Sequence, residues 1–224
     1  MSNLQNRIDK LLKLTNESAS IEKLKPLNKS TNPRMFADWV GKNIAWAESK
    51  IDEAERQVGI SSSCKIGCNA CCYQAIGVSG TEAKAIKGYM QRKSLDERKS
   101  IYAKIQIACN LLDEKVPLVH QVSLANQTEF RQQYFEAHIK CPLLSDEGKC
   151  TVYPVRPASC WGYRMYGEPN ECSTAADVDY TATFHPFEHL VIDSMIESSP
   201  AYLSTHKHFH ALPFSLLETL KDIV

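Results

Sequence analysis

In this chain of 224 residues, cysteine is the residue type whose number and spacing most clearly indicate a chemical role. Four cysteines fall close together early in the chain, and four more are spread through a later segment. They are Cys64, Cys68, Cys71 and Cys72 in the first group and Cys141, Cys150, Cys160 and Cys172 in the second. Thiolates are preferred ligands of zinc and of iron–sulfur clusters in proteins. We therefore interpret the eight cysteines as a metal-binding core that two distant parts of the chain build together.

The spacing within the first group favours more than one metal ion or a multi-iron cluster. Cys68 and Cys71 are separated by two residues, which is common in thiolate sites, whereas adjacent Cys71 and Cys72 cannot easily both bind one ion. The group could converge as one face of a helix over 64–72 or around a loop at Gly67. Eight thiolates fit two four-sulfur zinc sites or two four-cysteine iron–sulfur clusters, and the sequence leaves both open.

Basic residues beside the cysteines could offset the charge of such a site. Two divalent ions on eight thiolates leave about four negative charges. The candidates to balance them through hydrogen bonds and the local field are Lys65, Lys149, Arg156 and Arg164. The alternative is that the cysteines are small buried hydrophobic residues. Their clustering favours the metal interpretation, whereas the isolated Cys109, beside the apolar stripe of a helix, is expected only to pack.

Short motifs around the cysteines resemble a known family. They are Cys64, Cys68 and Cys71-Cys72, then Cys141-Pro142-Leu143-Leu144, Gly148-Lys149-Cys150-Thr151-Val152-Tyr153 and Arg156-Pro157-Ala158-Ser159-Cys160. This pattern, over about residues 60–175, resembles the YkgJ-type cysteine cluster family. That family is described as a zinc- or iron-chelating domain and is similar in its cysteine motif to flagellin lysine N-methylases. The resemblance implies a metal-chelating core at these cysteines.

Three functions are compatible with the pattern, and whether the protein is an enzyme stays open. The first is a metal-binding module whose fold depends on zinc or an iron–sulfur centre, because a shared metal closes the long connection between Cys72 and Cys141. The second, which the resemblance implies, is an iron–sulfur enzyme in redox or protein methyl-transfer chemistry. The third is a zinc-stabilised module that docks a protein partner through an N-terminal amphipathic helix. The apolar face of that helix carries Leu4, Ile8, Leu11 and Leu12.

Composition argues against several classes of partner. The 26 Lys and Arg residues balance 26 Asp and Glu residues, so bulk charge gives no reason to expect binding to nucleic acid or to an anionic membrane surface. No stretch approaches the roughly eighteen apolar residues of a membrane span, and the N-terminus lacks an apolar signal region. We expect a soluble cytoplasmic protein, in whose reducing surroundings cysteines serve metal or redox chemistry rather than disulfides.

The elements that must position the cysteines are predicted to be helices. An Asn32-Pro33 start, followed by apolar residues every three or four positions, predicts a helix that runs to about Val58 and delivers the chain to the first cysteines. Further helices are predicted after caps at Thr81 and Ser94. Others are predicted around 127–139, 186–197 and 214–223. No strand pairs are predicted.

The fold class predicted from these elements is mainly α, a helical single domain with an irregular cysteine-rich metal-binding region. Residues 1–32 are predicted to be an N-terminal arm and linker, with a short amphipathic helix over 2–14. Residues 33–224 are predicted to form the domain, and the length suits one core. Proline and glycine interrupt 141–172, so we expect this segment to be shaped by its ligands.

Histidines give weaker signals. His206, His208 and His210 could act as borderline metal ligands, but such a run is more often a solvated tail. His185 and His189 share helical spacing without the glutamate of a metalloprotease motif, so we assign them to structure.

Overall fold

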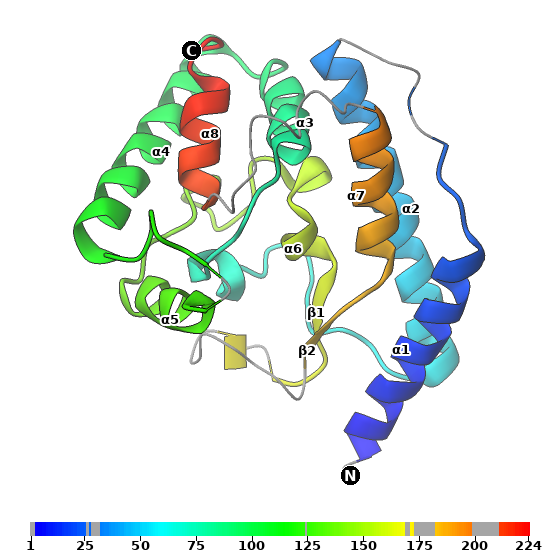
Figure 1. The fold of residues 1–224 in the computed structure, drawn as a ribbon. Helices are drawn as coiled ribbons and strands as arrows, with labels where there is room; N and C mark the ends of the chain where they lie inside the picture. Colours follow the sequence, from blue (N-terminus) through cyan, green and yellow to red (C-terminus); the bar gives the residue numbers. More distant parts are fainter. Residues whose placement is uncertain are drawn as a thin grey trace.

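The computed structural model describes residues 3–25, 27, 32–123, 125–168, 171–172, 182–198 and 211–224. Within them the chain is mainly helical, as predicted (Figure 1). The α-helices are α1 (Asn3–Ile21), α2 (Pro33–Val58), α3 (Gly80–Met90), α4 (Leu95–Lys115), α5 (Gln127–Glu136), α6 (Ala158–Trp161), α7 (Phe187–Ser198) and α8 (Leu212–Leu220). The other elements are the 3₁₀ helices η1 (Ala70–Tyr73) and η2 (Tyr153–Val155) and the strands β1 (Tyr163–Met165) and β2 (Ala182–Phe184).

Helix α2 begins and ends where its sequence predicts. The Asn32 side chain accepts hydrogen bonds from the backbone N–H groups of Arg34 and Met35, at 2.9 and 3.4 Å. Pro33 occupies the first helical position, where its missing N–H costs nothing. Gly59 ends the helix at φ 72°, a left-handed conformation that glycine adopts without strain. The turn at Gly59 leads the chain from α2 into the first cysteine segment.

The main apolar core is built by α2, α3, α4, α7 and α8, with α2 packed on α3 and α7, and α8 packed on α3 and α4. Figure 1 shows α4 and α8 on one side of the molecule and α1, α2 and α7 on the other, with α6 and the small sheet between them. The approach of α3 to α2 is very close: a Cβ atom at Gly88 would lie 1.8 Å from the Pro33 carbonyl oxygen. Only a residue without a side chain permits this packing. The largest fully buried side chains of these helices include Phe36, Ile51, Ile86, Met90, Ile105, Leu112, Phe187 and Leu216.

Helix α3 is capped by Ser79, two residues before the predicted cap Thr81. The Ser79 side chain and Glu82 form a reciprocal capping box. Glu82 has a second role, because its Oε1 accepts a hydrogen bond from the backbone N–H of Ala158 at 2.8 Å. One buried carboxylate therefore joins the start of α3 to the start of α6. The predicted capping role of Ser94, with Glu97, is confirmed for α4.

Helix α1 differs from the predicted arm and linker in two ways. It continues to Ile21, so the first part of the segment expected to be a linker over 15–32 is helical. Its apolar face is also covered, because Ile8 and Leu11 are buried in a cluster with Ala54 of α2 and Tyr166. Leu4 and Leu12 are partly buried at the edge of the same cluster. A partner would have to displace α2 to reach the face that the docking hypothesis requires.

A small antiparallel sheet is a further departure from prediction, because no strand pair was expected. Residues of β1 pair with β2 in the register Tyr163 to Phe184, Arg164 to Thr183 and Met165 to Ala182. Three residues are too few to show an alternating pattern in the sequence. Beyond this sheet, Leu144 and Cys150 form a single bridge, after which the chain turns into η2.

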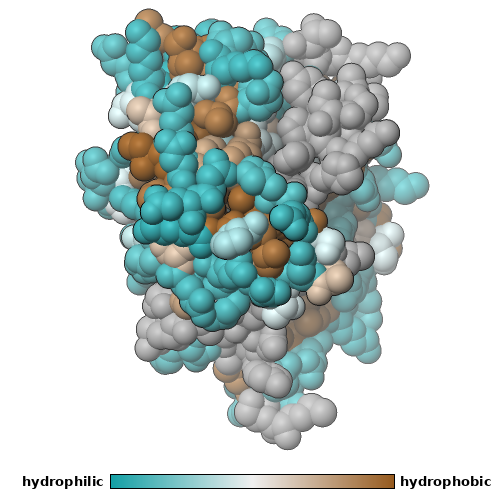
Figure 2. Space-filling model, turned by 60° about the vertical axis from the view of Figure 1, so that its left-hand side comes forward, coloured by the Kyte–Doolittle hydropathy of each residue, from teal (hydrophilic) through white to brown (hydrophobic). Residues whose placement is uncertain are grey.

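The surface is mostly polar on the side seen in Figure 2, where hydrophilic residues cover most of the face and hydrophobic residues lie between them in patches. The exposed large hydrophobic side chains include Ile21, Met35, Ile66, Leu95 and Ile107. Among the described residues, no helix combines the length and the apolar character that crossing a membrane requires.

Candidate functional site

The first cysteine segment is a loop followed by a short 3₁₀ helix, which is the second of the two geometries left open by its spacing. The chain turns at Ile66-Gly67, where Gly67 adopts φ 93°. It then forms η1, which carries Cys71 and Cys72. The regular helix over 64–72 that would have put the four thiols on one face is absent, and the turn at Gly67 brings them together instead.

The second cysteine segment is tied directly to the first. The backbone N–H of Cys141 donates to the Cys72 carbonyl oxygen at 2.8 Å. A turn then returns the chain so that Leu144 bridges to Cys150, and the Cys141 and Cys150 side chains pack against the main core. Cys160 lies on α6. Residues far apart in the sequence are thus joined by backbone hydrogen bonds at the cysteines themselves.

All eight predicted cysteines line one cavity of about 560 Å³. Cys64 and Cys68 are exposed at this cavity, Cys172 is buried, and the remaining five are partly buried. All nine cysteines of the chain are free thiols. Cys109 is 3% exposed within α4 and packs in the main core, as predicted. Within the described part of the chain, no three His, Cys, Asp or Glu side chains stand in an arrangement ready to hold a metal ion. The structure therefore brings the eight thiols to a common space without placing them in a coordination geometry.

The thiols of the adjacent pair Cys71 and Cys72 are joined by a hydrogen bond. The hydrogen bond from Cys72 lowers the pKa of Cys71 to about 7, against the effect of burial, and the positive charge of Arg156 lowers it further. The same hydrogen bond raises the pKa of Cys72, and burial adds to this effect. One sulfur of the pair therefore takes on thiolate character while the other keeps its hydrogen.

Burial keeps the later thiols protonated. It raises the pKa of Cys141 to about 12 and that of Cys172 to about 11, and it also raises the pKa of Cys150 and Cys160. The charges of neighbouring cysteines act in the same direction. A buried thiolate is costly in a low-dielectric interior, and a bound cation is the kind of partner that removes this cost.

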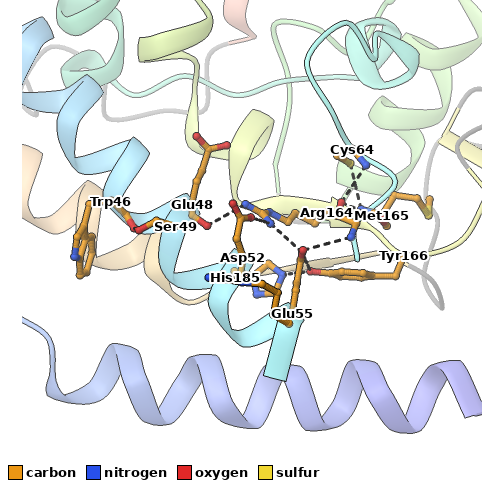
Figure 3. A network of polar contacts seen from close by, with 12 residues as sticks. Trp46, Glu48, Ser49, Asp52, Glu55, Cys64, Arg164, Met165, Tyr166 and His185 are labelled. Atoms are coloured by element: carbon orange, nitrogen blue, oxygen red, sulfur yellow. Dashed lines mark hydrogen bonds and ion pairs between the residues drawn. The ribbon is translucent and has the colours of Figure 1, made fainter. Parts of the chain in front are cut away.

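The opposite wall of the cavity is a stripe of carboxylates on α2. Glu48, Asp52 and Glu55 are spaced by one helical turn each, and all three line the cavity. Two arginines from the second cysteine segment meet this stripe, and Figure 3 shows Arg164 with Asp52 and Glu55. Arg156 pairs with Glu48, whereas Arg164 Nη1 lies 2.6 Å from Asp52 Oδ1 and 2.9 Å from Glu55 Oε1. These ion pairs attach the cysteine-bearing loop to the helical core.

The two arginines are buried beside the cysteines, whereas the two lysines predicted with them are exposed. The side chains of Arg156 and Arg164 are 8% and 9% exposed. Arg156 stacks over the Tyr153 ring at 3.9 Å and donates to the Cys160 carbonyl oxygen at 3.4 Å. Lys65 lines the cavity but is exposed, and Lys149 is also exposed. The arginines are therefore the basic residues held close to the sulfurs, but the three α2 carboxylates already offset their charge.

A buried hydrogen-bond chain leads from the cavity wall to His185. Tyr166 donates its hydroxyl proton to Glu55 Oε1 at 2.9 Å, and the same hydroxyl lies 2.7 Å from His185 Nε2 (Figure 3). Burial and the charge of Arg164 lower the pKa of His185 to about 3, so the ring is neutral. These contacts assign the proton to Nε2, and Nδ1 has no partner among the described residues. His185 is thus a buried, neutral ring hydrogen-bonded behind the cavity wall.

Sequence reasoning did not single out the α2 carboxylates or the Tyr166–His185 pair. The signal for the carboxylates was present, because Glu48, Asp52 and Glu55 recur at helical spacing directly before the first cysteines. His189 is exposed on α7, as its structural assignment allows. The run at His206, His208 and His210 lies outside the described residues.

Comparison with known proteins finds no match to a family model, to a curated protein or to a solved structure.

Proposed function

We propose that this protein is a metal-binding cysteine-cluster protein that chelates zinc or an iron–sulfur centre through its eight clustered cysteines. The observation that supports this most directly is that eight thiols from two distant segments line a single cavity while the ninth, Cys109, packs elsewhere. Cysteines retained for packing alone would be distributed among apolar clusters, as Cys109 is. The resemblance of the motifs to the YkgJ-type family agrees with the proposal.

The support of the ligand-bearing backbone agrees with the same proposal. Arg156 and Arg164 are fixed beside the cysteines by hydrogen bonds and ion pairs with α2. Such outer groups hold the ligand-bearing backbone in place. Because Glu48, Asp52 and Glu55 already offset the arginine charges, bound cations would supply the charge that balances the thiolates.

The sulfurs must move towards one another to bind an ion, because zinc–sulfur bonds are about 2.3 Å long. The loop at Gly67 and the irregular segment after Cys141 can supply that movement, since their backbone is not fixed by regular helical hydrogen bonds. Metal binding would then complete the packing of the cysteine region rather than fill a rigid site.

Metal analysis of anaerobically purified protein tests the proposal. Wild-type protein is expected to contain zinc or iron in a fixed ratio to the chain, and Cys141→Ser is expected to lower that ratio. The matched control is Cys109→Ser, which removes a thiol outside the cavity and should leave metal content unchanged. Wild-type protein without bound metal, or equal metal in both variants, would count against chelation by the clustered thiols.

An iron–sulfur enzyme is the second candidate, and the size of the cavity favours it. Small-molecule sites commonly enclose roughly 300–1,000 Å³, and a cavity of about 560 Å³ with charged and aromatic walls falls in this range. Redox or methyl-transfer chemistry would need such room beside the cluster. A brown protein with an absorption band at about 400 nm would support this function, because iron–sulfur clusters absorb there by sulfur-to-iron charge transfer. A colourless zinc protein would remove its support.

A further inference from the structure

The backbone of β1 is bonded to the chain around the first cysteine. The Met165 carbonyl oxygen accepts a hydrogen bond from the Ser63 N–H at 2.8 Å and another from the Ser62 hydroxyl at 3.1 Å. The Met165 N–H donates in turn to Cys64 Sγ at 3.4 Å. The Ser63 hydroxyl adds a bond to the Gly167 carbonyl oxygen at 2.5 Å. Two segments far apart in the sequence therefore meet in a defined register, with a backbone donor directed at a cysteine sulfur.

One carboxylate on α2 is bonded to both sides of this junction. The Glu55 side chain is 9% exposed, and its Oε1 accepts from Arg164 Nη1 at 2.9 Å and from the Tyr166 hydroxyl at 2.9 Å. Its Oε2 accepts from the Ser62 N–H at 3.4 Å. Figure 3 shows Glu55 reaching towards Arg164 and Tyr166. Because these two residues flank Met165, Glu55 is tied to the later segment on both sides of the donor and to the early segment at Ser62.

Side-chain alternation along the extended segment explains this reach. Arg164 and Tyr166 are two positions apart, so their side chains leave the same face of the segment and meet Glu55 there. The Met165 side chain leaves the opposite face and packs with Cys172. A change at Glu55 therefore acts first on the backbone register rather than on the packing around Cys172.

Asp52 makes the same ion pair without the same reach. Its Oδ1 lies 2.6 Å from Arg164 Nη1, and like Glu55 it lines the cysteine cavity. Its side chain is 59% exposed, and within the described part of the chain it is bonded to Arg164 but not to Ser62 or Tyr166. Both carboxylates bring charge to Arg164, but only Glu55 spans the junction.

We propose that Glu55 is a positioning residue for the metal site. It holds the register between residues 62–64 and 164–166, which keeps the Met165 N–H on the Cys64 sulfur. This inference rests on the proposed function and names the residue that controls how firmly Cys64 retains metal. A hydrogen bond to a thiolate takes up part of its charge, and such bonds tune both the affinity and the electronic properties of a metal centre.

Three variants of α2, each replacing a carboxylate by its amide in the full-length chain, test the role. Glu55→Gln keeps the shape of the side chain but exchanges one acceptor oxygen for an amide donor, so the bonds on both sides of the junction cannot all form. Asp52→Asn removes the other carboxylate charge from Arg164. Glu53→Gln is the control, because Glu53 is exposed on the same helix. Metal retention is measured by competition with EDTA. The thiolate-to-metal charge-transfer band is recorded for the iron protein, or for Co²⁺-loaded protein if the metal is zinc.

Glu55→Gln is expected to weaken metal affinity by about 10–100-fold. Its charge-transfer band should move to longer wavelength, because the Cys64 sulfur loses a hydrogen bond. Asp52→Asn should change the affinity by less than about fivefold, since solvent screens an exposed ion pair, and Glu53→Gln should not change it. If Glu55→Gln does not fold, Ser62→Ala breaks the same junction at a partly buried position and should shift the band in the same direction.

Amide hydrogen exchange distinguishes failure of this inference from failure of the proposed function. In protein stripped of metal, the Ser63 and Met165 N–H groups should exchange faster in Glu55→Gln than in Asp52→Asn. Equal exchange and equal metal retention in these variants would overturn the positioning role and leave the proposed function standing. Weaker retention with an unshifted band would also overturn it, because the effect would then be one of general stability. Metal-free wild-type protein would overturn the proposed function, and exchange alone would then decide whether Glu55 holds the register.

Discussion

The two halves of α2 face different kinds of structure. Both halves bury apolar side chains in the core, Phe36 and Val40 from the first and Ile51 from the second, but only the second half also presents Glu48, Asp52 and Glu55 to the cysteine cavity. The core is stabilised by apolar burial, which needs no ligand. The cysteine region is held by ion pairs, isolated backbone hydrogen bonds and, as proposed, by metal. One helix thus belongs to a self-sufficient core and at the same time anchors a region that we propose to be completed by a bound metal.

The largest expected effect comes from removing the proposed metal. Chelation should leave α2, α3 and α4 folded and should loosen the segment from 141 to 157, because that segment lacks a regular helical hydrogen-bond pattern. Amide hydrogen exchange there is expected to rise by about a hundredfold or more, which corresponds to losing about 2.7 kcal/mol of ligand stabilisation. Equal acceleration in the helical core would show that the two regions are not independent.

Truncation of a core side chain tests whether the apolar core can be weakened without affecting metal binding in the cysteine region. Phe36 is fully buried, so Phe36→Ala should lower the free energy of unfolding by about 3–5 kcal/mol. Metal per folded chain should not change. Met35, one residue earlier and 55% exposed, supplies the control, since Met35→Ala is expected to stay within about 0.5 kcal/mol of wild type. Denaturant unfolding with metal analysis would separate the effects, and loss of metal from folded Phe36→Ala protein would contradict the comparison.

Acid should weaken the junction between the two regions through His185. Its pKa is about 3 in the folded protein, against roughly 6.5 when unfolded, so between these values the unfolded chain binds a proton that the folded chain does not. The stabilisation is complete above pH of roughly 6.5 and falls as pH decreases, by up to about 1.4 kcal/mol per pH unit.

The measurement is the pH dependence of the free energy of unfolding in His185→Gln and in the control His189→Gln. His185→Gln should flatten the pH dependence of the free energy of unfolding, because His185 is buried. His189→Gln should leave that dependence unchanged, because His189 is exposed on α7. Similar slopes in both variants would mean that other groups, including the cysteines, dominate acid unfolding.

The smallest expected effect is at the start of α2. Asn32→Ala removes the side-chain acceptor for two backbone N–H groups and should cost about 1 kcal/mol. Thermal unfolding should shift downward while metal content stays the same. Asn32→Asp retains an acceptor and serves as the matched control. Loss of metal from folded Asn32→Ala protein would indicate that this cap also positions the cysteine segment.

The helices were predictable because their signals are local. The Asn32-Pro33 start, Gly59 and the Ser94 cap each appear within a few residues of the boundary that they define. The pairing of β1 with β2, the burial of Ile8 against Tyr166 and the meeting of Cys72 with Cys141 depend on residues far apart in the chain. No periodic pattern encodes such contacts. The candidate cysteines could be named from their clustering, but their neighbours in space could not.

The hydrogen bond that the Ala158 backbone N–H donates to Glu82 connects the cysteine region to α3. Glu82 fixes the N-terminal turn of α3 and also holds the turn that precedes Cys160. A displacement of Cys160 towards an ion would therefore reach α3 through one carboxylate, without any rearrangement of the apolar interior. The first turn of α3 is the natural place for a spectroscopic label that reports what happens at the sulfurs from a distance.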